Sequence, residues 1–259
     1  MALADPTRRF SSRVENYIRY RPSYPVQVLE TLREICGLTP PAAVADIASG
    51  TGIFSQMLLD NGYDVFGVEP NREMREAAER HLARYSNFTS VNGTAEETTL
   101  PAGSVDLATA AQAAHWFDLP RARCEFARIL KPGRWAVLLW NERDTDSTAF
   151  LRDYEQLLIA YGTDYQQVRH EHTTANLGSF YAPSTFQERV FAMRQEFNFG
   201  DLEGRLLSSS YAPLKGHANY ESMLKELRRI FDDQQKDGRV AMDYRTRVYY
   251  GRLTYSLGL

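Results

Sequence analysis

The middle of the chain alternates short apolar runs with amphipathic segments. This alternation is typical of a parallel sheet that carries helices on both faces, so the predicted fold class is α/β and doubly wound. A Lys-Pro-Gly turn at 131–133 separates the last helix of this region from the last strand. The expected strands cover residues 43–48, 63–69, 88–92, 105–111 and 135–140, and the expected helices cover residues 51–60, 71–84 and 119–130.

The segments on either side of this region have weaker patterns. Helices are expected at 24–36, 149–161 and 220–235, and a last strand at 244–253 is expected to join the sheet in the antiparallel direction. The predicted organisation is a helical N-terminal cap (1–42), the sheet core (43–141), a helical insertion (142–215) and a C-terminal helix and strand that complete the sheet (216–259).

Composition narrows the class of protein. The chain has 259 residues, 43% of them hydrophobic and 24% charged, which is ordinary for a globular protein. No apolar run is long enough to span a membrane, and the first residues lack the apolar region of a secretory signal, so we expect a cytoplasmic protein without a membrane partner. The net charge of −3 gives no basic surface for nucleic acid.

Metal chemistry is not expected. Cys36 and Cys124 lie far apart without CxxC spacing, so they indicate neither a disulfide framework nor a cysteine metal site. His170 and His172 stand two residues apart with no third ligand nearby in the sequence. The prediction is therefore that the protein binds no metal.

A glycine-containing turn joins the first strand to the first helix. Residues 44–52 read Val-Ala-Asp-Ile-Ala-Ser-Gly-Thr-Gly, and the second strand ends at Glu69. Glycine allows close approach of a ligand to the backbone, and the start of a helix offers free N–H groups. A carboxylate at the neighbouring strand end can accept hydrogen bonds from ribose hydroxyls. The pattern predicts a cofactor that contains ribose.

NAD is one such cofactor, and an NAD-linked oxidoreductase remains an alternative. A dinucleotide fingerprint requires a third glycine after the first two. Here Gly50 and Gly52 are followed by Ile53, Phe54 and Ser55, so the third glycine is absent. In addition, the strand carries an acidic residue just before the turn, where a dinucleotide-binding strand is usually apolar. Both features argue against NAD as the cofactor.

At these residues the chain resembles the class I S-adenosylmethionine-dependent methyltransferases, whose first motif reads D-h-G-x-G-x-G. Asp46, Gly50 and Gly52 match that motif, and Ala48 stands in place of its first glycine. Residues 92–96, Asn-Gly-Thr-Ala-Glu, are similar to the family's loop beside adenine. Residues 20–25, 104–107 and 111–118 resemble the narrower group that includes trans-aconitate methyltransferase.

The resemblance implies that S-adenosyl-L-methionine is the cofactor, with the glycine turn holding its methionine portion and Glu69 its ribose. It also implies a Rossmann-like sheet, an N-terminal cap over the cofactor and an insertion that covers the substrate. The expected cofactor-binding residues are Tyr17, Arg21, Asp46, Ala48, Gly50, Gly52, Glu69, Pro70, Ala95, Glu96 and Gln112.

The implied reaction is methyl transfer to a small-molecule acceptor, with a carboxylate oxygen as the first candidate. His115 follows the fourth strand and is the best-placed candidate base, and the aromatic rings of Trp116 and Tyr17 can flank a sulfonium. Since Ala48 departs from the motif, an inactive methyltransferase-like binding protein stays open as an alternative, and so do a monomer and a homodimer. The expected catalytic residues are His115 and Trp116, and the expected substrate-binding residues are Tyr24, Trp140, Arg143, Ser210 and Tyr211.

Overall fold

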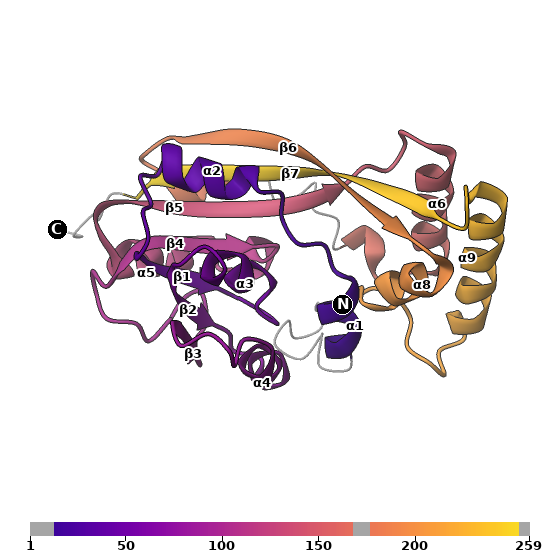
Figure 1. Cartoon of the computed structure of the whole chain (residues 1–259), viewed down its shortest axis with the longest axis horizontal. Coiled ribbons are helices and arrows are strands. Elements are labelled where there is room, and N and C mark those ends of the chain that lie inside the picture. The colour runs from indigo at the N-terminus through magenta and orange to yellow at the C-terminus, as the bar shows by residue number, and fades with distance from the viewer. Residues whose placement is uncertain (1–12, 168–176, 254–259) are drawn as a thin grey trace.

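Seven strands form a single mixed sheet in this computed structural model, which describes residues 13–167 and 177–253 (Figure 1). The strand order is β3-β2-β1-β4-β5-β7-β6, and β1 to β5 run parallel, while β7 runs antiparallel to both of its neighbours. The prediction of a doubly wound α/β sheet with an antiparallel last strand is confirmed. The strands are β1 (Ala43–Ile47), β2 (Asp64–Val68), β3 (Phe88–Val91), β4 (Val105–Ala111), β5 (Leu130–Arg143), β6 (Phe186–Phe197) and β7 (Val240–Arg252).

Four of the described helices begin at a residue whose side chain caps them. Asn71, Asp118, Thr148 and Asn198 each accept a hydrogen bond from the backbone N–H three residues later, which satisfies a free donor at the helix start. No helix in the described ranges is both long and apolar enough to cross a membrane. The helices are α1 (Val14–Tyr20), α2 (Gln27–Glu34), α3 (Ile53–Leu59), α4 (Arg72–His81), α5 (Leu119–Ile129), α6 (Ala149–Tyr161), α7 (Leu177–Tyr181), α8 (Phe199–Leu207) and α9 (Tyr220–Gln234).

Both faces of the sheet are covered by helices. Side chains alternate along β1, so Val44 packs with α2 and α3 on one face while Ala45 and Ile47 pack with α5 and α7 on the other. Val28 and Leu32 of α2 belong to the first of these layers, so this helix is part of the sheet core. Within the N-terminal segment predicted to be a cap, only the part around α1 lies beside the pocket described below.

The strands β5, β6 and β7 are much longer than the others and continue beyond the core to helices α6, α8 and α9 (Figure 1). β5 has 14 residues where β1 has 5, and it includes the turn 131–133, next to which its pairing with β4 shifts register. Leu157, Leu206, Leu227 and Met242 form a third core beneath those helices. One continuous sheet therefore connects the core to a separate helical layer.

β6 lies in the segment predicted to be a helical insertion. It pairs with β7 along its whole length and forms the edge of the sheet. Most of its residues are exposed or half-buried, and only Phe197 at its end is buried. An edge strand of this kind has no continuous apolar run, so hydrophobic patterning alone does not reveal it.

α1 reaches the helical layer by packing against α8, and Gly204 makes this contact possible. A Cβ atom at position 204 would lie 2.1 Å from the ring of Tyr20. Gly204→Ala should therefore lower the free energy of unfolding by about 1–3 kcal/mol, the usual cost of overpacking. Gly178→Ala is the matched control, because Gly178 is also helical but has open space at its Cβ position. Equal unfolding curves in urea for the two variants would contradict the role of this contact.

Candidate active site

The chain has a pocket of about 710 Å³ between the sheet core and the helical layer. It lies beyond the carboxyl ends of β1 and β4, where the strand order reverses and where open α/β sheets bind their ligands. β5 and β7 form one wall, and α1, α8 and the segment after α8 form another. The predicted site residues that line it are Tyr17, Arg21, Tyr24, Asp46, Ala48, Gly50, Gln112, His115, Trp116, Arg143, Ser210 and Tyr211.

The turn after β1 has three residues in the left-handed region, and they serve different purposes. A Cβ at Gly50 (φ +58°) would meet no protein atom within 4 Å, whereas one at Gly52 (φ +84°) would lie 2.6 Å from Leu82. Gly50 therefore keeps space open beside the pocket, and Gly52 allows helix packing. Ala48 keeps the left-handed conformation (φ 55°) although it has a Cβ, which costs about 1–2 kcal/mol.

Glu69 follows β2 and is held by the backbone of two turns. Its Oε2 accepts a hydrogen bond from Gly50 N at 2.9 Å, and its Oε1 accepts one from Asn71 N at 2.8 Å. Burial raises the pKa of this carboxyl, and the two N–H donors act in the opposite direction. Each oxygen keeps a second lone pair for a ligand hydroxyl. Glu69 is thus oriented to accept hydrogen bonds beside the glycine turn.

Asp46 has one satisfied and one unsatisfied oxygen. Its Oδ2 accepts a hydrogen bond from Ser55 Oγ at 2.6 Å, while the buried Oδ1 has no partner in the described part of the chain. Burial raises the pKa of Asp46 to about 7, against the opposing effect of the Ser55 bond. An unsatisfied buried acceptor in a pocket wall indicates a place where a ligand donor binds.

The raised pKa of Asp46 gives stability a defined pH dependence. The folded protein binds this proton more tightly than the unfolded chain, so the free energy of unfolding falls as the pH rises from about 4 to about 7. The loss amounts to at most about 4 kcal/mol. Asp46→Asn should remove it, so the melting temperature of the variant relative to the parent should be higher at pH 8 than at pH 5 without ligand. Parallel pH profiles would refute this assignment.

The segment after β4 brings the candidate catalytic residues to the pocket. His115 and Trp116 lie on one turn of 3-10 helix, with ring centroids 4.6 Å apart. Gln112 begins this segment with a left-handed backbone (φ 60°), and its N–H donates to Leu139 O at 2.8 Å. Strained non-glycine residues persist where the surroundings fix them, often at functional sites. Ala48 and Gln112 are both of this kind, and both line the pocket.

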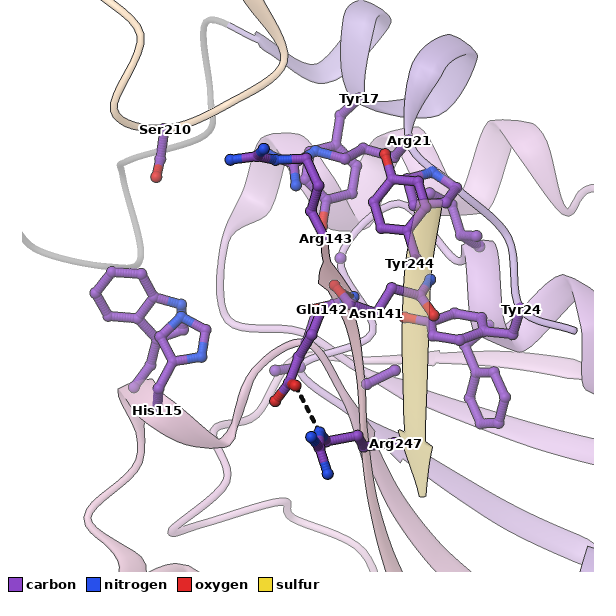
Figure 2. A pocket seen from close by; sticks show the side chains of 18 of the residues that line it. Tyr17, Arg21, Tyr24, His115, Asn141, Glu142, Arg143, Ser210, Tyr244 and Arg247 are labelled. Atoms are coloured by element: carbon purple, nitrogen blue, oxygen red, sulfur yellow. Dashed lines mark hydrogen bonds and ion pairs between the residues drawn. The ribbon is translucent and has the colours of Figure 1, made fainter. Parts of the chain in front are cut away.

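The wall farther along β5 and β7 carries many charged groups (Figure 2). Arg143 forms an ion pair with Glu155 at 2.5 Å, and Arg247 binds Glu142 at 2.5 Å and Glu188 at 2.6 Å. In Figure 2, Tyr17, Arg21 and Arg143 gather at the top of the view and Arg247 lies below them. The pocket is therefore strongly polar at this wall.

Several predicted residues do not line the pocket. Trp140, which was expected to bind substrate, is not among the lining residues: it is 2% exposed and packs against Tyr249 in the core below the pocket. Ala95 is buried in the same core, and Glu96 accepts a hydrogen bond from the backbone of Asp118 at 2.9 Å. Gly52, Glu69 and Pro70 are not among the lining residues, and Glu69 lies beside the glycine turn, where it accepts the hydrogen bond from Gly50 N.

His170 and His172 lie outside the described residues. Within residues 13–167 and 177–253, no group of three or more His, Cys, Asp or Glu side chains could hold a metal ion.

Sequence reasoning missed the pocket residues that come from distant segments. Arg205 of α8 is the clearest case, because it is 6% exposed and lines the pocket. A signal was present in the sequence, since Arg205 shares a helix face with Leu202 and follows it by three residues. The other pocket residues missed include Asn141, Glu142, Tyr165, Glu188, Tyr244 and Arg247.

Comparison with known proteins finds similarity to methyltransferases. Residues 45–138 match the model of a methyltransferase domain. An uncharacterized methyltransferase of Mycobacterium tuberculosis is 37% identical over 171 residues, which are 65% of this chain and 65% of the relative's length. An uncharacterized methyltransferase of Schizosaccharomyces pombe is 25% identical over 239 residues, 89% of this chain and 92% of the relative.

A solved structure shares the fold. The putative type II methyltransferase from Anaeromyxobacter dehalogenans superposes with a TM-score of 0.67 and 24% identity, over 90% of this chain and 98% of that chain. The match of the domain model covers β1 to β5, the strands that place Asp46, Gly50, Glu69 and His115 at one edge of the sheet. Residues 45–138 therefore match a methyltransferase domain, and the chain has the same fold as that solved structure.

Proposed function

We propose that this protein is an S-adenosylmethionine-dependent methyltransferase that acts on a small-molecule acceptor, with a carboxylate oxygen as the methylated atom. One observation carries the proposal: Asp46, Gly50 and His115 line a single pocket at the switch point of a methyltransferase domain, and Glu69 is bonded to the Gly50 backbone behind it. The pocket volume of about 710 Å³ suits a cofactor and a small acceptor together.

The residues present fit the cofactor that the family implies. Glu69 has free lone pairs for ribose hydroxyls, and the open space beside Gly50 allows a ligand to approach the backbone closely. The buried Oδ1 of Asp46 accepts no hydrogen bond from the described residues. When bound, S-adenosylmethionine supplies an electrophilic methyl group on a positively charged sulfur. Trp116 and Tyr17 present aromatic rings that stabilise such a charge.

The protein's own residues then have two tasks. The pocket walls align the acceptor with the donor and exclude water, which is the main requirement of an in-line displacement. His115 faces the pocket and can accept a proton from an acceptor that carries one. A carboxylate acceptor is already ionised at neutral pH and needs no base. The similarity of residues 20–25 and 111–118 to the trans-aconitate methyltransferase group supports an acidic acceptor.

The NAD-linked alternative finds no support in the pocket. Ser55 occupies the position where a dinucleotide fingerprint has its third glycine, and its hydroxyl is buried and bonded to Asp46. The domain that matches this region is a methyltransferase domain.

Transfer of a radiolabelled methyl group tests the proposal. The purified protein is incubated with labelled S-adenosylmethionine and a panel of carboxylic acids, phenols and amines. We expect labelled methyl esters from one or more acids. Labelling of phenols or amines alone would refute the carboxylate oxygen and leave the methyltransferase activity standing. Cofactor binding without turnover across the panel would favour an inactive binding protein.

A further inference from the structure

Three arginine side chains from distant parts of the chain meet at one wall of the pocket. Arg21 follows α1, Arg143 ends β5 and Arg205 belongs to α8. Arg205 is 6% exposed as a residue, and the side chain of Arg143 is 10% exposed. Aromatic rings hold two of them in place, since the Cζ of Arg21 lies 5.0 Å from the centroid of Tyr17 and that of Arg143 lies 5.0 Å from the centroid of Tyr154. We call these three residues the arginine cluster.

The arginine cluster has fewer carboxylates around it than guanidinium groups. In the part of the chain that the structure describes, its only carboxylate is Glu155, which pairs with Arg143. Glu142 and Glu188 also line the pocket, but both bind Arg247. Buried charges in proteins are normally paired, because an unpaired one is costly to desolvate. The cluster thus carries an excess of positive charge next to the pocket.

The cluster also has hydrogen-bond donors to spare. Arg143 Nη1 and Arg205 Nε are buried and have no hydrogen-bond partner in the described residues. Arg21 Nε donates to Ser208 Oγ at 3.1 Å, and Arg205 Nη1 donates to Ser209 Oγ at 3.1 Å. Neutral hydroxyl groups satisfy these donors without neutralising the charge. A guanidinium with free donors is suited to bind a carboxylate or phosphate.

The three arginines differ in their electrostatics: burial acts to lower the pKa of Arg143 and Arg205, but neighbouring tyrosines raise the pKa of both. Burial lowers the pKa of Arg21, and the nearby charge of Arg205 lowers it further. Burial alone would raise the pKa of the Tyr211 hydroxyl, but Arg205, Arg21 and Arg143 together lower it from its ordinary value. The hydroxyl of Tyr211 therefore lies in the positive field of all three guanidinium groups, and Tyr211 itself lines the pocket.

We propose that the arginine cluster is an anion-binding subsite that holds a carboxylate or phosphate group of the acceptor other than the atom that is methylated. This inference rests on the proposed function, because it assigns to the methyl acceptor a second, acidic group. The acceptor is then bound at one end by Arg21, Arg143 and Arg205 while its other end faces His115. Such two-point binding fixes orientation as well as affinity.

The effect of a substitution on melting temperature distinguishes a ligand subsite from a structural role of these arginines. If the arginines served the fold, replacing one would destabilise the protein. If they form a ligand subsite, Arg205→Met removes an unpaired buried charge and should raise the melting temperature of the ligand-free protein. Met has a similar length and no charge, so it can occupy much of the space of the arginine side chain.

The test uses the full chain without a methyl donor, in sodium chloride, sodium glutarate or sodium phosphate at equal ionic strength. Glutarate and phosphate should raise the melting temperature of the parent protein by about 2 °C or more over chloride. Arg205→Met should lose this increase. Arg247→Gln should keep it, because Arg247 also lines the pocket but is already neutralised by two carboxylates. A response to only one of the two anions assigns the group that the subsite takes.

The subsite is refuted if neither anion stabilises the parent protein more than chloride, or if Arg205→Met responds as the parent does. A lower melting temperature of Arg205→Met in chloride would also refute it, in favour of a structural role. Failure of Arg205→Met to fold counts in the same way, and Arg21→Gln in the same three salts gives an independent comparison. Because no methyl donor is present, a negative result leaves methyl transfer itself untouched, and a lack of methyl transfer leaves anion binding testable.

Discussion

Glu69→Ala is expected to weaken binding of S-adenosylhomocysteine by at least about tenfold. The carboxylate is buried and held by the N–H groups of Gly50 and Asn71, so it offers its remaining lone pairs to ribose hydroxyls at a fixed position. A hydrogen bond to a charged group is worth about 1.5–3 kcal/mol, which corresponds to tenfold or more in affinity. Titration calorimetry on the parent and the variant measures the difference directly.

Two controls accompany this prediction. Glu73→Ala removes an exposed carboxylate from the nearby helix α4 and should leave the affinity unchanged. Glu69→Gln keeps the shape of the side chain but has only one acceptor oxygen, so its affinity should lie between those of the parent and Glu69→Ala. Unchanged affinity in Glu69→Ala would show that the ribose is bound elsewhere.

Gly50→Ala should also lose about tenfold or more in affinity, for a steric reason. The added Cβ meets no protein atom within 4 Å, so it would project into the space where the ligand approaches the turn. The left-handed backbone at this position (φ +58°) adds a cost of about 1–2 kcal/mol in stability.

The variant Gly103→Ala distinguishes the steric effect on affinity from the backbone effect on stability. Gly103 has almost the same backbone (φ +59°) and the same open space at its Cβ position, but it does not line the pocket. Both variants should lose similar stability in urea, and only Gly50→Ala should lose affinity for S-adenosylhomocysteine in calorimetry. Equal affinities would mean that the ligand does not approach Gly50.

The parallel core was predictable because its signals are local. The apolar run 105–111 is β4 as predicted, and the capping side chain of Asn71 begins α4. The glycine turn and Glu69 lie on consecutive strands, and consecutive parallel strands end at the same edge of a sheet. A short stretch of sequence was therefore enough to place the expected cofactor residues together.

The helical layer and the acceptor side of the pocket were not predictable in the same way. Arg21, Arg143 and Arg205 come from three segments that span 184 residues of sequence, and no local pattern encodes their meeting. β6 is an exposed edge strand without an apolar run. Trp140 ends the apolar run of a central strand, and it packs against Tyr249 of β7, which pairs with β5 only in the folded chain.

The most direct test of the central claim, that this pocket binds the product of methyl transfer, is titration calorimetry of the full chain with S-adenosylhomocysteine and, separately, with NADH. We expect saturable binding of S-adenosylhomocysteine at one site and no binding of NADH. Absence of binding at millimolar S-adenosylhomocysteine, or saturable binding of NADH in its place, would contradict it.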